Sequence, residues 1–230
     1  MWSDIVSDQG NPRHQQHQVA LFTTVILTFP ASSPAMKFLA GLVHAAAASQ
    51  VVFDNLDPLD TGATGTPISK DQGVAVQFRS LPAADTACNP TWLTLDFVNF
   101  TLNTINMGGN TSLWLQADLC PSVDGLPNCT KSDKPARIPI DKFAKRVKFQ
   151  WFPASPIVLI PSTTYWFTVL SNGEVKNKLP IWMDGAKQFN TVNDPKKDVL
   201  LAYTATQGGP WTVDVPRENR TVSSLQVYAN

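Results

Sequence analysis

The chain has 230 residues with 18 basic and 18 acidic side chains, a balance that gives no reason to expect a nucleic acid or an anionic membrane surface as partner. Its 18 prolines argue against a helical bundle, because proline is excluded from helix interiors. The only histidines are His14, His17 and His44. A chain processed after them would therefore lack Ser-His-Asp catalysis, Cys-His catalysis and histidine-containing zinc sites.

The first 49 residues have the features of an export segment. In MKFLAGLVHAAAASQ, which begins at Met36, a positive start at Lys37 is followed by an apolar middle and then by small residues. This order is typical of a secretory signal peptide, so we predict cleavage near Ala48 to Gln50 and an extracellular, secreted product. An earlier apolar run, VALFTTVILTF, ends at Pro30, and translation could instead start at Met36. The alternative is an uncleaved signal anchor made from both runs.

From residue 51 onward, short apolar strands alternate with turns rich in Gly, Pro, Asn and Asp. In VAVQFRS and RVKFQWF, large apolar side chains recur at every second position, as in a strand with one buried face. In WLTLDFVNFTL, Leu93, Leu95 and Phe97 share one parity while Val98, Phe100 and Leu102 take the other, which predicts a bulge or bend near Phe97. The pattern predicts an all-β, jelly-roll-like antiparallel β-sandwich. We expect one domain over residues 50–230, preceded by the hydrophobic extension.

Tyr165 and Trp166 are neighbours in the predicted strand of PSTTYWFTVLSNG, so their rings point to opposite faces. Tyr165 shares its parity with Phe167 and Val169, and we assign these three side chains to the core. We expect Trp166 to be covered by a crossing loop or to lie on a strand that is buried on both faces. Trp151 alternates with polar residues in KFQW and is also assigned to the core.

Tryptophan supplies the best ligand candidates. Sugars stack on exposed indole rings through their C–H faces, and jelly-roll modules commonly bind carbohydrate in this way. We select Trp114, whose parity opposes that of its leucine neighbours, Trp211, which follows the turn QGGP, and Trp182. The alternative for each ring is a place in the core, because tryptophan is highly buried on average.

Three acidic side chains in DNLDPLD are candidate calcium ligands. Asp54, Asp57 and Asp60 are spaced three residues apart, and hard oxygen donors on one loop suit calcium. The stretch lacks the ligand spacing and the turn glycine of an EF-hand, so the alternative is a solvated loop that uses Asx turns. No other cofactor is predicted.

Two further features agree with export. Cys120 and Cys129 bracket the turn-rich PSVDGLPN, and a disulfide between them would close a loop. Cys88 would then have no partner within the chain. The alternative is three reduced cysteines. Sequons for N-glycosylation occur at Asn99, Asn110, Asn128 and Asn219.

The sequence offers little material for catalysis. It contains no phosphate-binding loop, HExxH, GxSxG or CxxC pattern. A glycosidase needs a pair of carboxylates, and beyond the leader the glutamates are Glu174 and Glu218, both in predicted loops, with Asp118 and Asp184 as alternatives near strand ends. We expect no enzymatic activity.

Several stretches in fixed order resemble the bacterial choice-of-anchor R family of surface domains. They are VFDN, LWLQADLCPSVDGLPN, IVLIPSTTYWFTVLSNG, LPIWMDG and GGPWTVDV, and they extend over most of residues 51–230. The resemblance implies an extracellular jelly-roll-like sandwich with no established activity. No terminal apolar stretch of the kind that directs a glycolipid anchor is present, so we expect a soluble secreted product.

Together these observations predict a secreted, N-glycosylated, non-enzymatic β-sandwich that serves as a surface or matrix interaction module. Its expected partner is a glycan or an extracellular protein, with no nucleic acid and no membrane span in the mature chain. The alternative is a carbohydrate-binding module that uses exposed tryptophans, and a glycoside-active enzyme is the third reading.

Overall fold

Strands dominate the fold of this protein. The computed structural model describes residues 49–56, 64–83, 92–107, 112–129, 137–188, 201–204, 209–214 and 221–230, all within one compact unit, Ala46–Asn230. Over these ranges no helix has the length and apolar character needed to cross a membrane. The strands are β1 (Gln50–Asp54), β2 (Gly65–Pro67), β3 (Gly73–Arg79), β4 (Leu93–Asn103), β5 (Trp114–Val123), β6 (Leu126–Pro127), β7 (Arg137–Pro139), β8 (Val147–Trp151), β9 (Val158–Leu159), β10 (Thr164–Ser171), β11 (Ile181–Gln188), β12 (Leu201–Thr204), β13 (Trp211–Val213), β14 (Thr221–Ser223) and β15 (Leu225–Ala229), and the 3-10 helices are η2 (Ile105–Met107) and η3 (Lys176–Lys178).

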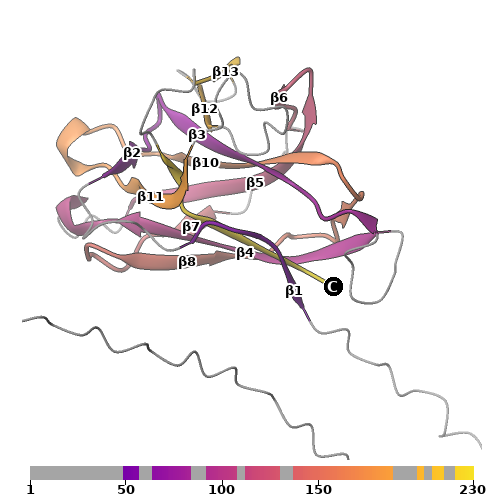
Figure 1. The fold of residues 1–230 in the computed structure, drawn as a ribbon. Coiled ribbons are helices and arrows are strands. Elements are labelled where there is room, and N and C mark those ends of the chain that lie inside the picture. The colour runs from indigo at the N-terminus through magenta and orange to yellow at the C-terminus, as the bar shows by residue number, and fades with distance from the viewer. Residues whose placement is uncertain are drawn as a thin grey trace, which may run out of the picture. The chain divides into compact units, whose positions relative to one another are not determined.

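The described strands form two antiparallel sheets that pack face to face (Figure 1). The eight-stranded sheet has the order β1-β15-β4-β11-β14, with β8 and β9 also on β4 and β2 on β11. The seven-stranded sheet has the order β13-β12-β3-β10-β5-β6, with β7 also on β5. The chain crosses repeatedly from one sheet to the other, as from β3 to β4 to β5, which is the jelly-roll manner of building a sandwich. The predicted all-β sandwich is confirmed.

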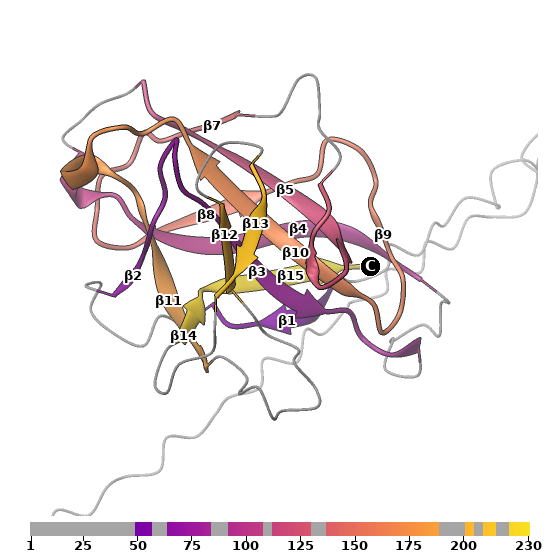
Figure 2. The same ribbon diagram turned by 90° about the horizontal axis from the view of Figure 1, so that it is seen from above.

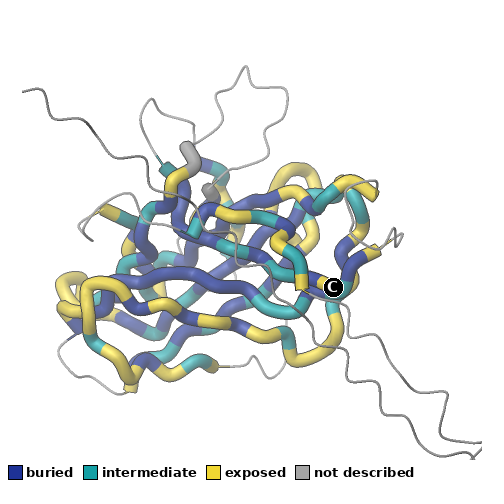
Figure 3. The backbone as a smooth tube through the Cα atoms, turned by 60° about the horizontal axis from the view of Figure 1, so that its bottom comes forward, coloured by how far each residue is buried: buried dark blue, intermediate teal, exposed yellow. Residues whose placement is uncertain are grey.

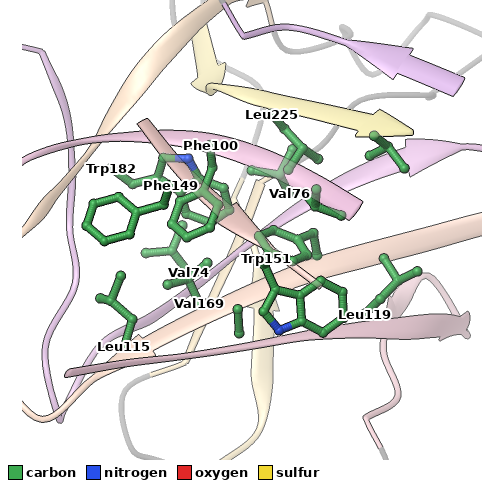
Figure 4. Close-up of a cluster of buried hydrophobic side chains, with 14 of the residues drawn as sticks. Val74, Val76, Phe100, Leu115, Leu119, Phe149, Trp151, Val169, Trp182 and Leu225 are labelled. Carbon is green, nitrogen blue, oxygen red and sulfur yellow. The ribbon is translucent and has the colours of Figure 1, made fainter. Parts of the chain in front are cut away.

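The core fills the space between the sheets, and buried residues alternate with exposed ones along many strands (Figure 3). Phe167 of β10 joins the two sheets: its ring centroid lies 5.5 Å from those of Phe100 and Trp151 and 6.0 Å from that of Trp182. The last three rings all come from the eight-stranded sheet and meet in the cluster of Figure 4. The predicted core positions of Trp151 and Phe167 are confirmed.

Strand β4 changes its inward parity part-way, as the sequence predicted. Leu95 pairs with Ala229 and Phe97 pairs with Tyr228, which leaves Asp96 as one extra residue on β4. This is a β-bulge, because the chain advances by two residues on β4, from Leu95 to Phe97, where it advances by one on β15, from Ala229 to Tyr228. Residues before the bulge and residues after it both reach the core, while Asp96 and Phe97 remain on the outer face.

Trp166 is fully buried on the outer face of the seven-stranded sheet. It packs with Ala75 and Ala202, and Trp211 and Val213 of β13 lie against this group. Figure 2 shows β13 beside its partner β12. The indole nitrogen of Trp166 donates a hydrogen bond to Ser122 Oγ at 3.1 Å. The expected strand that is buried on both faces is therefore confirmed.

The predicted disulfide closes the base of the β5–β6 hairpin. Cys120 and Cys129 are joined with their Cα atoms 4.7 Å apart. The turn between the strands uses Asp124 and Gly125, whose φ values of 51° and 77° suit the Asp-Gly pair that tight hairpins favour. Cys88, the predicted start at Met36 and the predicted leader through Ala48 lie outside the described residues.

Trp182→Ala should lower the free energy of unfolding by about 3–5 kcal/mol, because it removes a fully buried ring and leaves a cavity between the sheets. Trp92→Ala is the matched control, since the side chain of Trp92 is 60% exposed and its loss should change stability by less than about 0.5 kcal/mol. Urea unfolding followed by circular dichroism measures both values. Equal stability of the two variants would contradict the core role of Trp182.

Candidate functional site

The three tryptophans selected from the sequence do not form an open platform. Trp182 is fully buried, and its indole nitrogen donates a hydrogen bond to the carbonyl of Ser224 at 2.8 Å, so the prediction that it faces a ligand is wrong. Trp211 is partly buried because it packs over Trp166. Trp114 is partly exposed, but the Arg137 guanidinium lies 4.5 Å from its ring centroid and covers one face.

The acidic loop after β1 is only partly described. Asp54 is exposed and its Oδ1 accepts a hydrogen bond from the backbone N–H of Leu56 at 3.1 Å, which is an Asx turn. Asp57 and Asp60 lie outside the described residues, so the calcium site stays a prediction. Within the described ranges, no three acidic, cysteine or histidine side chains are grouped as a metal site requires.

Two of the four sequons can be placed. Asn128 is exposed next to the disulfide. Asn99 is only 4% exposed, and its Nδ2 donates a hydrogen bond to Gln226 Oε1 at 3.4 Å. The burial of Asn99 argues against a glycan at that sequon, because the modified nitrogen must reach solvent. Asn110 and Asn219 lie outside the described residues.

Glu174, Asp118 and Asp184, the candidate catalytic carboxylates that the structure describes, are not brought together in pairs. Glu174 is exposed in the loop after β10 and forms an ion pair of 2.9 Å with Lys70. Asp118 lies on β5 and Asp184 on β11, which belong to different sheets. Burial of the Asp118 carboxyl raises its pKa, partly offset by the hydrogen bond that it accepts from the N–H of Leu119 at 2.8 Å. Glu218 lies outside the described residues.

A row of apolar side chains instead crosses the outer face of the eight-stranded sheet. Val51 of β1 is paired with Tyr228 of β15, and Tyr228 is paired with Phe97 of β4. The rings of Phe97 and Tyr228 are stacked with centroids 4.4 Å apart, and Phe152, which directly follows β8, lies 5.8 Å from Phe97. Phe152 is 59% exposed and Val51 is 43% exposed, so both ends of the row face solvent.

The same outer face continues along β4 toward its start. Leu93 pairs with Leu159 of β9, and both side chains are buried. Trp92 and Ile160 each lie one residue beyond that pair, so alternation turns both to the outer face, where each is 60% exposed. Val158, two residues before Ile160, shares this face and is 50% exposed.

We call these side chains the outer strip. It contains five of the ten large apolar side chains that are exposed in the described part of the chain, together with the half-buried rings of Phe97 and Tyr228. Single apolar side chains on a surface need no explanation, whereas contiguous ones mark a binding surface. The outer strip consists of Val51, Trp92, Phe97, Phe152, Val158, Ile160 and Tyr228.

Polar groups interrupt the outer strip at the β-bulge. The Asp96 carboxylate accepts hydrogen bonds from Asn230 Nδ2, at 2.8 Å, and from Ser49 Oγ. The backbone groups of Thr94 and Asn230 also bond each other, at 2.7 and 2.9 Å. The first and last described residues of the chain therefore meet at the middle of the strip.

A second polar group flanks the aromatic row on its other side. Asn99 is paired with Gln226 of β15 and with Gln150 of β8, which places three amide side chains in one line across the sheet. Gln150 is exposed, while Asn99 is covered by its neighbours. The outer face thus offers apolar rings beside uncharged hydrogen-bonding groups.

Sequence reasoning missed most of the outer strip. Trp92 is the most exposed tryptophan among the described residues, yet nothing in its local sequence distinguishes it from the other rings. The parity slip near Phe97 was the one available signal, since a bulge there can turn a side chain away from the core. The pairing of Phe97 with Tyr228 depends on strand register between segments 131 residues apart, 228 minus 97, and no local pattern reveals it.

Comparison of the chain with protein-family models and with curated proteins found no match. The resemblance to choice-of-anchor R domains therefore stays a prediction. A functional assignment has to rest on the residues of this chain.

Asp118→Asn should stabilise the protein at pH 7 and leave its stability unchanged near pH 3. Because burial raises the folded-state pKa of Asp118, the ionised carboxyl disfavours folding, and this cost appears as the pH rises from the unfolded pKa of about 3.9 through the folded value. Asparagine keeps an oxygen that can accept the Leu119 N–H. Urea midpoints at the two pH values test this, with Asp141→Asn, at an exposed position, as control. A lower midpoint for Asp118→Asn at pH 7 would contradict the prediction.

Proposed function

We propose that this protein is a secreted, N-glycosylated, non-enzymatic interaction module that binds a partner through the outer strip. The observation that carries the proposal is that five exposed apolar side chains share one face of the eight-stranded sheet with the half-buried rings of Phe97 and Tyr228. Burying such a surface against a partner gains hydrophobic free energy at about 25 cal/mol per Å² of apolar area removed from water.

Export is supported by the hairpin that carries the disulfide. A closed disulfide between Cys120 and Cys129 suits an oxidising compartment, and the exposed sequon at Asn128 lies beside it. Ser49, at the predicted cleavage point, already contacts Asp96, so cleavage before Ser49 leaves the described fold whole.

The positions of the described carboxylates support binding rather than catalysis. Glu174 is solvated and paired with Lys70, and Asp118 and Asp184 belong to different sheets. An extracellular sandwich without established activity is also what the resemblance to choice-of-anchor R domains implies, and we include membership of that family in the proposal.

Secretion of the full chain from a eukaryotic host tests the export part. We expect protein in the medium with an amino terminus between Ser49 and Val51 and a glycan on Asn128 but not on Asn99, read by peptide mass spectrometry. Asn128→Gln should remove that glycan and leave secretion intact. Retention of the intact chain inside the cell with Met1 or Met36 at its start would overturn export.

Binding is tested with washed extracellular matrix of the organism that encodes the protein. The secreted protein should be retained on it, and Trp92→Ser combined with Phe152→Ser should reduce retention at least about tenfold, because both exposed rings are lost. The matched control is Val175→Ser with Tyr203→Ser, two exposed apolar side chains outside the outer strip. Equal retention of both double variants would overturn the assignment of the surface.

A further inference from the structure

The two most exposed rings of the outer strip are separated along β4. Phe152 lies beside Phe97, and Trp92, which directly precedes β4, is five residues before Phe97. At about 3.3 Å per residue and with one bulge between them, the two positions are roughly 15 Å apart. A ligand that covers both must be extended, and a single small molecule would reach only one.

The groups between the two rings are polar and hydrogen-bonded. Asp96 accepts from Asn230 and Ser49, and the hydroxyl of Thr94 belongs to the same outer face by alternation. The Asp96 carboxylate can exchange its present hydrogen bonds for bonds to hydroxyl groups of a ligand at little cost, because it remains paired and the exposed side chains of Ser49 and Asn230 can bond to water. On the other side of the aromatic row, the exposed amide of Gln150 offers both a donor and an acceptor.

The charges of this face argue against an anionic surface as the occupant. Residues 152–163, which supply three members of the outer strip, contain no charged side chain, and the strip itself contains no lysine or arginine. The nearby carboxylates are Asp54 and Asp96, while Lys148 is the exposed cation of β8. An anionic lipid surface or an acidic glycan attracts clustered lysine and arginine. The exposed cations Lys145, Arg146 and Lys148 lie at the start of β8, whereas Phe152 of the outer strip follows its end.

The alternation of rings with polar groups also argues against a protein partner. The centre of a protein interface is continuously apolar and surrounded by a polar rim. Here the polar groups Thr94, Asp96 and Asn230 occupy the middle of the strip, between Trp92 at one end and Phe152 at the other. Alternating C–H faces and hydroxyl groups are the surface of a sugar chain.

We propose that the outer strip binds a linear, uncharged polysaccharide, with Trp92 and Phe152 as two separate ring platforms and with Thr94, Asp96 and Gln150 as hydrogen-bonding groups. This inference rests on the proposed function and names its ligand class. Aromatic faces carry negative charge density that attracts the polarised C–H groups of a sugar ring. Phe97, whose ring is stacked on that of Tyr228, packs beside Phe152 and holds it in place.

The test measures retention of the full secreted protein on insoluble cellulose and chitin, and its affinity for soluble β-1,3-glucan and mannan by gel retardation and calorimetry. We expect at least one of these four to bind. Trp92→Ala and Phe152→Ala should each weaken binding about tenfold or more, and Gln150→Ala should weaken it severalfold, while Val175→Ala and Tyr203→Ala should not. Urea midpoints of the variants must match that of the parent protein.

Three outcomes would overturn the inference. Binding of a neutral polysaccharide that Trp92→Ala and Phe152→Ala leave intact would remove the site from the outer strip. Binding to polyanionic heparin in preference to the neutral probes would overturn the ligand class. No polysaccharide binding, together with strip-dependent retention on extracellular matrix that protease treatment abolishes, would establish a protein partner, so that the proposed function would survive and only the ligand class would fail.

Discussion

The β-bulge at Asp96 in β4 is the constraint on which the rest of the sandwich depends. β4 forms hydrogen bonds with β15 on one side, with β8 and β9 on the other, and with β11 at its end, so its side chains reach most of the core. If β4 were regular, Leu95 and Phe100, which are five residues apart, would point to opposite faces, because side chains alternate along a strand. With it, both enter the core, where Phe100 contacts Phe167 of the opposite sheet.

The same bulge creates the candidate binding surface. It turns both Asp96 and Phe97 outward, which sets a carboxylate beside an aromatic row. The pairing of β1 with β15 is also irregular, because its register shifts between Val51 and Phe53. Tyr228 therefore has an irregular partner strand on each side. Bulges increase local twist and end regular pairing. The irregular register therefore accounts both for the open row of rings and for the polar break within it.

The sequence predicted what depends on local alternation. The sandwich, the parity slip near Phe97, the core position of Trp151 and the covered position of Trp166 all follow from the period of two along single strands. Trp182 was misassigned because Trp182 and Met183 are both fully buried in β11, a strand covered on each face, where alternation carries no information. The outer strip was missed because its members come from five separate segments, and only the register joins them.

Coverage, and not residue type, decides which face can bind. The outer face of the seven-stranded sheet contains three tryptophans, Trp114, Trp166 and Trp211. Trp211 of β13 covers Trp166, and the Arg137 guanidinium covers one face of Trp114. The outer face of the eight-stranded sheet has fewer tryptophans, but its described strands have no layer comparable to β13 above them, and Trp92 and Phe152 stay exposed. A ring that is covered by its own chain contributes to stability, whereas a ring left in water at the middle of a sheet face costs hydrophobic free energy until a partner covers it. That difference in free energy is the physical reason for assigning the binding function to the outer strip.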